Sequence, residues 1–402
     1  MQKKILFLGA AHTQMPPLRY AKSQGHYVIT CDNLPQNPGH KLADESHNVS
    51  TTDKESVLQL AKYLQIDAIV AYASDPAAPT AAFVSEHMNL PGNPYDCVNT
   101  LARKDLFRRF LKKNGFNVPK SKSFRQPDVA WNWVRGLAKP AFIKPVDSSG
   151  SKGVTKFTNT VESEKEFVRA FRHALSFSRE KKVLIEEEIK RRSYQVAGDG
   201  FLVDGELVFR CWADEHFDKL CNGLVPIGQT FPTSHSETQL ELAHKETQRL
   251  IAALGMKTGA LNFDLIFDET GELYFLELGP RNGGCLIPEV IHFATGVDLI
   301  KYTVDAALGL PCCDLSIKPT IGFWSSYMIH SIEHGTYNDL YLSDRIKPKI
   351  IQKDIWVKKN DEVNLYRGSN DTLGTMILKF ESIDEMENLI ENMEHDIRVI
   401  LN

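Results

Sequence analysis

The chain has 402 residues, of which 42% are hydrophobic and 24% are charged. These proportions are typical of a folded globular protein and exclude a disordered or fibrous chain, while the length indicates two to three domains. With 47 Lys and Arg residues against 51 Asp and Glu residues, the formal net charge is -4, so the chain lacks the basic excess that drives nonspecific binding to nucleic acids or membrane surfaces.

The first hundred residues alternate short apolar runs with helical patterns, which predicts an α/β domain with a parallel sheet. The strand patterns lie at 5–8, 27–31 and 68–71, and a helical pattern lies at 56–64. Residues 9–14 stand where a dinucleotide-binding fold carries GxGxxG, but the second and third glycines are missing, so we predict no NAD site. Residues 10–14 and 74–76 are either substrate contacts at the carboxyl ends of strands or ordinary turns.

A cluster of chain breakers at 90–94 predicts a boundary near residue 100, followed by a basic helix over 100–114. The next part of the chain is rich in strands, with a hairpin turn at 203–206. Its strand patterns lie at 141–145, 183–186, 201–203 and 206–209. A helix over 236–254 then precedes two strands that flank a turn at 268–271. This order predicts an α+β domain over 101–310.

The chain after residue 310 forms a smaller strand-rich tail. Strand patterns lie at 351–357, 362–366 and 376–380, and an amphipathic helix lies at 383–393. We therefore predict a multidomain α/β and α+β protein. Its parts are a Rossmann-like parallel-sheet domain over 1–100, the α+β domain over 101–310 and a small strand-rich C-terminal subdomain over 311–402.

The same patterns predict where the protein resides. The longest apolar runs, such as residues 66–73, are far shorter than the roughly 18 residues that a membrane-spanning helix needs. The apolar run near the N-terminus ends at His12 and is better explained as a strand than as a signal peptide. The seven cysteines include no CxxC pair, which predicts neither a disulfide framework nor a zinc ribbon. We expect a cytoplasmic protein with reduced cysteines and no membrane partner.

A lysine on a strand precedes a loop of small residues. Lys144 lies in the strand pattern at 141–145, and residues 148–154 read Ser-Ser-Gly-Ser-Lys-Gly-Val. Glycines allow backbone N–H groups to converge on an anion, and the ammonium group of Lys144 would offset phosphate charge. The loop does not match the Walker A pattern. Taken alone, it is either a phosphate-binding loop or a flexible turn.

Two acidic residues lie on the strands around the turn at 268–271. Antiparallel pairing across this turn places Asp264 and Glu277 on one face, offset diagonally by roughly 7 to 8 Å. A carboxylate pair among apolar neighbours is costly unless a cation compensates it, and magnesium that bridges ATP phosphates is such a cation. The alternative is a solvent-facing strand surface. Arg281 and the glycines that follow it favour the metal site.

The order of these motifs resembles that of the ATP-grasp enzymes of the carboxylate-amine ligase type, which include carbamoyl-phosphate synthetase large-chain-like and amino-acid ligase-like proteins. The resemblance covers nearly the whole chain. The matching motifs are Lys104 in LARKD, Lys144 in IKP, the loop 148–154, the hinge LIEEEI at 184–189, and the metal strands with Asp264 and with Glu277 in ELGPR. It implies a preATP-grasp domain over 1–100, an ATP-grasp domain over 101–310 and a C-terminal subdomain.

The resemblance also implies how ATP is bound. Lys104 and Lys144 would hold the phosphates, and the loop 148–154 would close over them as a lid. The lid contacts would come from Ser149, Gly150, Ser151, Gly153 and Val154. Glu186 would accept a hydrogen bond from the adenine amino group, and backbone groups of Glu187 and Ile189 would complete the recognition of the base.

The chemistry would lie at the other end of the triphosphate. Asp264 and Glu277 would ligate Mg2+, or Mn2+ in its place, and Arg281 would act with Lys144 as a catalytic residue by binding the substrate carboxylate or the transferring phosphoryl group. Two positions depart from the family pattern. Gln195 stands near where an acid usually binds the ribose, and Gly279 stands where many members carry a metal-binding asparagine, so either Asn282 or water would replace that ligand.

The implied activity is an ATP-dependent ligase that forms a carbon–nitrogen bond. A carboxylate would attack the γ-phosphorus of ATP to give an acylphosphate and ADP, and an amine would then displace phosphate. The expected partners are a small-molecule carboxylate and an amine, with no nucleic acid, and a homodimer is left open. Two alternatives stay open: a carboxylate-phosphorylating enzyme with a non-amine acceptor such as a thiol, and a catalytically inactive nucleotide-binding regulator.

Overall fold

The computed structural model describes residues 1–158 and 163–402, and four parallel strands form the sheet at the start of the chain. Their order is β3-β2-β1-β4. These elements are β1 (Lys4–Leu8), β2 (Tyr27–Cys31), β3 (Glu45–His47) and β4 (Ala68–Val70), with helices α1 (Met15–Ser23), α2 (Lys54–Leu64) and α3 (Ala78–Met88). The central strands are continuous apolar runs because helices cover both faces of a parallel sheet. This parallel sheet confirms the α/β prediction for the start of the chain.

A second, antiparallel sheet has the order β5-β8-β6-β7. Its elements are β5 (Ser121–Phe124), β6 (Ala141–Pro145), β7 (Thr155–Phe157) and β8 (Val183–Glu187), with helices α6 (Pro127–Val134) and α7 (Glu164–Ser176). One face of this sheet packs on the two helices around Phe157, Phe167 and Phe171. The opposite face carries Lys144 and Glu186 away from that core, toward the large sheet at the centre of the molecule.

The large sheet has eight strands in the order β13-β12-β9-β10-β11-β14-β18-β16. The strands are β9 (Gln195–Val203), β10 (Glu206–Phe217), β11 (Pro226–Phe231), β12 (Gly259–Phe267), β13 (Leu273–Gly279), β14 (Phe323–Ile329), β16 (Ile350–Ile355) and β18 (Gly374–Phe380). Helix α8 (Glu237–Leu254) and helix α9 (Ile287–Thr295) lie against it. Alternate residues of β9 enter two different apolar cores, Leu202 in one and Phe201 in the other. The sheet is therefore buried on both faces in this region.

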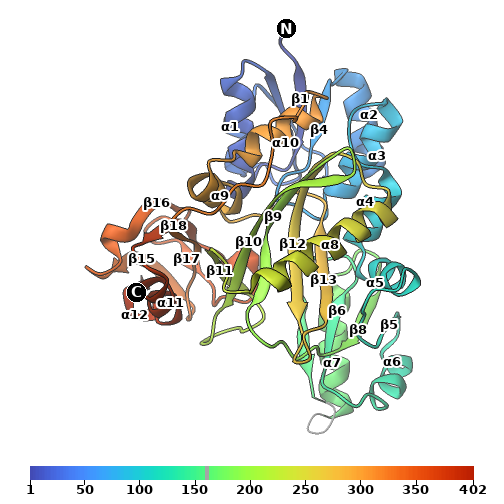
Figure 1. The fold of residues 1–402 in the computed structure, drawn as a ribbon, viewed down its shortest axis with the longest axis vertical. Coiled ribbons are helices and arrows are strands. Elements are labelled where there is room, and N and C mark those ends of the chain that lie inside the picture. The colour runs from blue at the N-terminus through green and yellow to red at the C-terminus, as the bar shows by residue number, and fades with distance from the viewer. Residues whose placement is uncertain (159–162) are drawn as a thin grey trace.

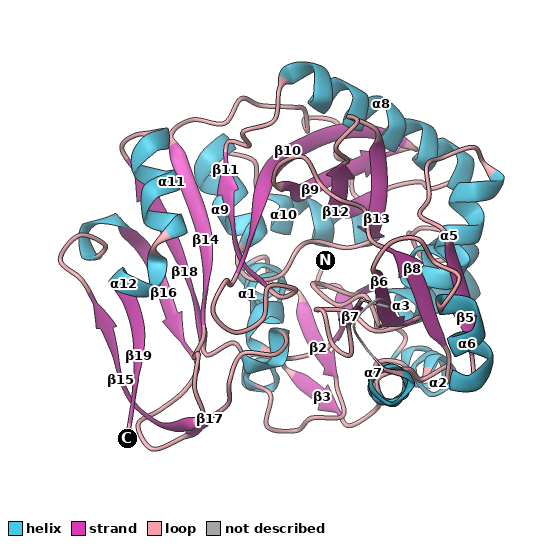
Figure 2. Ribbon diagram, turned by 90° about the horizontal axis from the view of Figure 1, so that it is seen from below, coloured by secondary structure: helices cyan, strands magenta, loops and turns pink. Residues whose placement is uncertain are grey.

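The chain after residue 310 is rich in strands, as expected, and three of its strands extend the large sheet. The remaining elements are β15 (Gly335–Leu342), β17 (Glu362–Val363), β19 (Ile397–Leu401), α11 (Ile383–Glu391) and α12 (Met393–Asp396). The first three form a small sheet in the order β17-β15-β19. Figure 1 shows these elements on the left of the molecule, opposite α6 and α7, and Figure 2 shows β15 and β19 at the edge.

Helix α10 (Leu299–Ala307) returns the chain to the N-terminal sheet. Its Val304 packs among Ile5 and Leu18, and Figure 1 shows α10 beside α1 and β1. The short 3-10 turns are His12–Gln14, Pro38–Lys41, Lys347–Lys349 and Ser369–Asp371. In the described ranges 1–158 and 163–402, no helix has the length and apolar character that crossing a membrane requires.

The single helix predicted over 100–114 is wrong, because the structure has two helices there. These are α4 (Tyr95–Ala102) and α5 (Lys104–Lys113), with Arg103 in an extended conformation between them. The break gives the first amide of α5 a partner outside the helix: the backbone N–H of Lys104 donates to the carbonyl of Val146 at 2.8 Å. This bond ties the start of α5 to the chain that follows β6, and it directs the Lys104 side chain into the candidate site.

Candidate active site

A cavity of about 660 Å³ lies between the four-stranded antiparallel sheet and the eight-stranded sheet. Of the residues predicted to bind ATP or metal or to act in catalysis, Gly153 and the alternative metal ligand Asn282 do not line it, and neither do the candidate substrate contacts at 10–14. The residues that do line it are Lys104, Lys144, Ser149, Gly150, Ser151, Val154, Glu186, Glu187, Ile189, Gln195, Asp264, Glu277 and Arg281. Gly153 has a φ of +75°, and a Cβ there would lie 2.8 Å from the ring of Phe177. Its backbone conformation and this close packing both require glycine.

Lys104 joins three parts of the cavity wall. Its Nζ lies 2.9 Å from Oε1 of Glu277 on β13 and donates to the carbonyl of Ser148, at the start of the glycine-containing loop, at 2.7 Å. The Lys104 residue is 8% exposed. The ammonium group is therefore fixed between the loop and a carboxylate that was predicted to bind metal, which is where a phosphate chain would need positive charge.

Lys144 is held by a buried carboxylate. Its Nζ lies 2.6 Å from Oε1 of Glu186 on β8, and Nε of Arg108 on α5 lies 2.8 Å from Oε2. Arg108 also donates to the carbonyls of Phe275 and Leu276, at 3.2 and 3.0 Å. Burial alone would raise the pKa of Glu186, but the charges of Arg108 and Lys144 outweigh it and lower the pKa to about 2.

This arrangement changes what is expected of Glu186. Both of its oxygens already accept hydrogen bonds from cations, and its side chain is 3% exposed. The geometry assigns the carboxylate to the positioning of Lys144 and Arg108, and contact with an adenine amino group stays a prediction. The basic helical pattern over 100–114 contained Arg108, but nothing in the sequence distinguished this arginine from its exposed neighbours.

Asp264 and Glu277 share one face of the sheet, as expected, but the predicted diagonal offset is wrong, since the two residues pair directly across β12 and β13. The turn is one residue longer than predicted, because Asp268 N–H donates to the carbonyl of Glu272. A bulge between Asp264 and Leu265 then shifts the register by one further residue in the same direction, which returns both side chains to one face. Such bulges re-aim side chains next to functional sites. Here the bulge turns both carboxylates toward the cavity.

A third carboxylate, Glu215 on β10, joins this pair. Burial, together with the negative charges of Glu215 and Glu277, raises the pKa of Asp264 well above its usual value. Burial also raises the pKa of Glu215 to about 7. Gln195 on β9 donates from Nε2 to Glu215, so the amide that stands where an acid was expected orients an acid on the neighbouring strand.

The acidic group fits a hard divalent cation. Oδ1 of Asp264 is buried and has no hydrogen-bond partner within the described part of the chain, and Glu215 and Glu277 border the same cavity. Oxygen donors alone are the set that Mg2+ prefers, and a cation would remove the repulsion that raises the pKa of Asp264. These residues therefore suit the metal that the resemblance implied.

Arg281 lies at the same end of the cavity and is paired with a residue of the N-terminal part. Its Nε and Nη2 lie 2.8 and 2.6 Å from the two oxygens of Asp75. The loop 74–76 was a candidate substrate contact, and Asp75 does line the cavity. Burial alone would lower the pKa of Arg281, but the charge of Asp75 outweighs it and raises the pKa.

Gly279 leaves room for this ion pair. A Cβ at this position would lie 3.0 Å from Cζ of Arg281 and 3.1 Å from Oδ1 of Asp75. An asparagine there would displace the pair. Asn282 does not replace it, because its Oδ1 accepts from Thr303 at 2.7 Å and the residue does not border the cavity. Asn262 does border the cavity, and its Nδ2 donates to Oδ1 of Asp199 at 2.9 Å.

The sequence contained a signal for Glu215 that was not used. The hairpin turn at 203–206 was predicted correctly, and β9 and β10 extend far beyond the short strand patterns that flanked it. Continued along both strands, the pairing reaches Gln195 opposite Glu215. Counting residue pairs outward from the turn would have predicted the position opposite Gln195 with an error of one residue. The error arises because one bulge lies between the turn and Glu215.

Comparison with known proteins shows what the chain around this site is similar to. Residues 101–285 match the family described as the ATP-grasp domain. The carbamoyl phosphate synthase large chain of a Thermoanaerobacter species is 26% identical over 246 residues, which cover 61% of this chain and 22% of that protein. The chain thus spans about a fifth of this relative.

Two solved structures share the fold along the whole chain. The L-amino acid ligase from Bacillus licheniformis has a TM-score of 0.82 and 19% identity, covering 100% of this chain and 99% of that one. The biotin carboxylase domain of the Hydrogenobacter thermophilus 2-oxoglutarate carboxylase, crystallised with MgADP and bicarbonate, has a TM-score of 0.76 and 18% identity, covering 100% and 91%. These similarities confirm the expected multidomain fold class.

Proposed function

Because residues 101–285 match the ATP-grasp domain family, we propose that the chain is an ATP-dependent ligase that joins a carboxylate to an amine, with release of ADP and phosphate. The observation that carries the proposal is the convergence of opposite charges in one cavity. Lys104 and Lys144 border the same 660 Å³ space as Asp264 and Glu277. A nucleoside triphosphate with its divalent cation has the charge distribution that this arrangement complements.

Each part of the wall has a place in the proposal. The ammonium groups of Lys104 and Lys144 bind the phosphate chain, and the loop 148–154 covers it. Mg2+, held by Asp264 and Glu277 with Glu215 nearby, would neutralise charge on the phosphate oxygens. Lys152 in the loop also borders the cavity, and burial lowers its pKa, so a phosphate oxygen beside its ammonium group would raise that pKa again.

The reaction proceeds in two displacements. An oxygen of the substrate carboxylate attacks the γ-phosphorus, the bond from that phosphorus to the bridging oxygen breaks, and ADP leaves. The amine nitrogen of the second substrate then attacks the acyl carbon of the acylphosphate, phosphate leaves with its oxygen, and the amine proton passes to solvent. Arg281, held in orientation by Asp75, binds the carboxylate and stabilises negative charge on the acyl oxygen.

The test is ADP release with paired panels of acids and amines. We expect one acid to support ADP formation only with Mg2+ and ATP, and an amine to raise the rate and appear in an amide product by mass spectrometry. If a product formed with a thiol and not with an amine, the acceptor would be a thiol, and the proposed amine acceptor would be wrong. Binding of MgATP without turnover on any pair would favour a nucleotide-binding regulator and contradict the proposal.

A further inference from the structure

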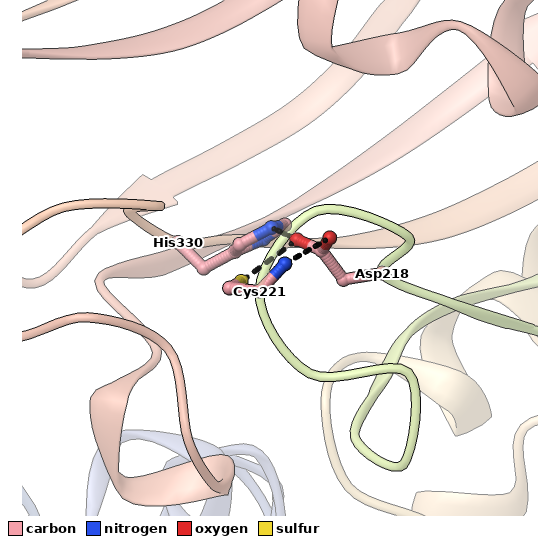
Figure 3. Close-up of side chains that lie close together, drawn as sticks. All are labelled: Asp218, Cys221 and His330. Carbon is pink, nitrogen blue, oxygen red and sulfur yellow. Dashed lines mark hydrogen bonds and ion pairs between the residues drawn. The ribbon is translucent and has the colours of Figure 1, made fainter.

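Three side chains with different ligand atoms meet outside the nucleotide cavity, at the ends of two neighbouring parts of the large sheet. Asp218 follows β10, Cys221 lies in the loop after it, and His330 follows β14. Nε2 of His330 lies 2.6 Å from Oδ2 of Asp218, and Sγ of Cys221 lies 3.1 Å from the same oxygen. Figure 3 shows the three side chains pointing toward one another. All three ligand atoms lie within 4.8 Å of each other.

The surroundings orient each of these groups. Nδ1 of His330 donates to the carbonyl of Met328 at 2.8 Å, which directs Nε2 toward Asp218. Oδ1 of Asp218 accepts from the backbone N–H groups of Leu220 and Cys221, which leaves Oδ2 for the cluster. The side chains of Asp218 and His330 are 5% and 6% exposed. Ligands around protein-bound zinc are oriented in the same way, by a second partner on the atom that does not face the metal.

We propose that Asp218, Cys221 and His330 bind one zinc ion, with water as the fourth ligand. Carboxylate, thiolate and imidazole are the donors that Zn2+ takes. A cavity of about 400 Å³ borders Asp218 and His330, which leaves space for the water or a small anion. Neither the proposed ligase activity nor its magnesium site involves these three residues.

Zinc binding would lengthen the two contacts to Oδ2 of Asp218. Ligand atoms of a tetrahedral zinc site lie about 3.3 to 3.6 Å apart, so Nε2, which lies 2.6 Å from Oδ2, would separate from it by roughly 0.7 Å, and Sγ, which lies 3.1 Å away, by a few tenths of an ångström. The two hydrogen bonds to Oδ2 break as bonds to the metal form. The thiol proton of Cys221 and the Nε2 proton of His330 leave to solvent, because the metal takes the lone pairs that carried them.

The site has a structural consequence for the nucleotide cavity. The loop that carries Cys221 continues through Gly223 and Leu224, which line that cavity. The carbonyl of Leu224 accepts from Oγ of Ser151 in the glycine-containing loop at 2.7 Å. Zinc would therefore fix one wall of the nucleotide cavity to His330 at the end of β14. His330 lies 109 positions after Cys221 in the chain.

Cobalt titration of the full chain tests this site directly. The protein is stripped of metal and saturated with Mg2+ and ADP, so that the oxygen ligands of the magnesium site are occupied. We expect one equivalent of Co2+ to bind with a sulfur-to-cobalt charge-transfer band and the strong visible absorption of tetrahedral Co2+, and Zn2+ to displace it. Absence of stoichiometric binding, or binding without the sulfur band, would overturn the proposal.

The variants separate this site from other cysteines. Cys221→Ser should abolish the charge-transfer band and weaken Zn2+ binding at least about tenfold, while Cys313→Ser, which changes an exposed cysteine, should change neither. His330→Gln should weaken binding by a similar factor, and it serves as the test if Cys221→Ser does not fold. Zn2+ should also slow amide exchange in residues 219–224 of the wild type alone. A band that persists in Cys221→Ser would place the metal elsewhere and refute the assignment.

Discussion

The buried carboxylate of Glu186 gives the sharpest quantitative prediction. In Glu186→Gln, the negative charge that pairs with both Lys144 and Arg108 is removed, and the one amide oxygen that remains can accept only as a neutral group. Arg108 keeps its hydrogen bonds to the carbonyls of Phe275 and Leu276. Breaking a buried ion pair by removing one partner costs about 3–5 kcal/mol. The lowering of the Glu186 pKa from 4.5 to about 2 corresponds to about 3 kcal/mol. We expect a loss of about 3 kcal/mol in the free energy of unfolding at pH 7.

The pH dependence of this loss has a definite sign. The pKa of Glu186 is lower in the folded than in the unfolded protein, so its contribution is complete above the unfolded value and is lost as the pH falls toward about 2. The difference between wild type and Glu186→Gln should therefore shrink to about 1.5 kcal/mol at pH 3. Denaturant unfolding at a series of pH values measures it. A difference that stays constant with pH would refute the reasoning.

A glutamate from the same segment provides the control. Glu188 forms a single ion pair with Lys156, at 2.6 Å, and the Lys156 side chain is 44% exposed. Such pairs contribute about 0 to 1 kcal/mol because water and salt screen them. Glu188→Gln should therefore change the free energy of unfolding by less than about 1 kcal/mol. An equal loss in both variants would show that the effect belongs to the segment and not to the buried ion pairs.

Three further predictions concern the acidic and basic ends of the cavity. Without metal, Asp264→Asn should raise the free energy of unfolding by about 1 kcal/mol, because it removes like-charge repulsion. The same variant should lose the extra stability that MgADP gives the wild type. Calorimetric unfolding with and without MgADP measures both effects. Because the pKa of Glu215 is raised to about 7, the metal-free protein should lose stability as the pH rises from about 5 to 7, and Glu215→Gln should flatten this slope in denaturant titrations. Arg281→Lys should lower kcat at least about tenfold and leave the Kd for ADP within about twofold, since a lysine cannot make the bidentate contact to Asp75; unchanged turnover would remove Arg281 from the reaction.

The motifs of the site were predictable because each lies in a short segment with its own signal. Lys144 ends a strand, the glycines mark a loop, and Asp264 and Glu277 flank a recognisable turn. Local signals of this kind can be recognised in the sequence without knowledge of the fold. They placed the carboxylates on one face although the turn length was wrong by one residue, since the bulge after Asp264 compensated for that error.

The contacts between distant segments were not predictable from those signals. Arg108 and Glu186 are 78 positions apart, and Arg281 and Asp75 are 206 apart. Their pairing depends on how α5 and the loop after β4 pack against other sheets, which no local pattern specifies. The break at Arg103 has the same cause: a tertiary hydrogen bond to Val146 overrides a continuous helical pattern.

The structure of the chain with a nonhydrolysable ATP analogue and Mg2+ tests the central claim most directly. The account predicts the triphosphate between Lys104 and Lys144, with the metal bound by Asp264 and Glu277 and the γ-phosphate nearest Arg281. A nucleotide bound outside the space between the two antiparallel sheets, or a metal that none of the three carboxylates ligates, would contradict it.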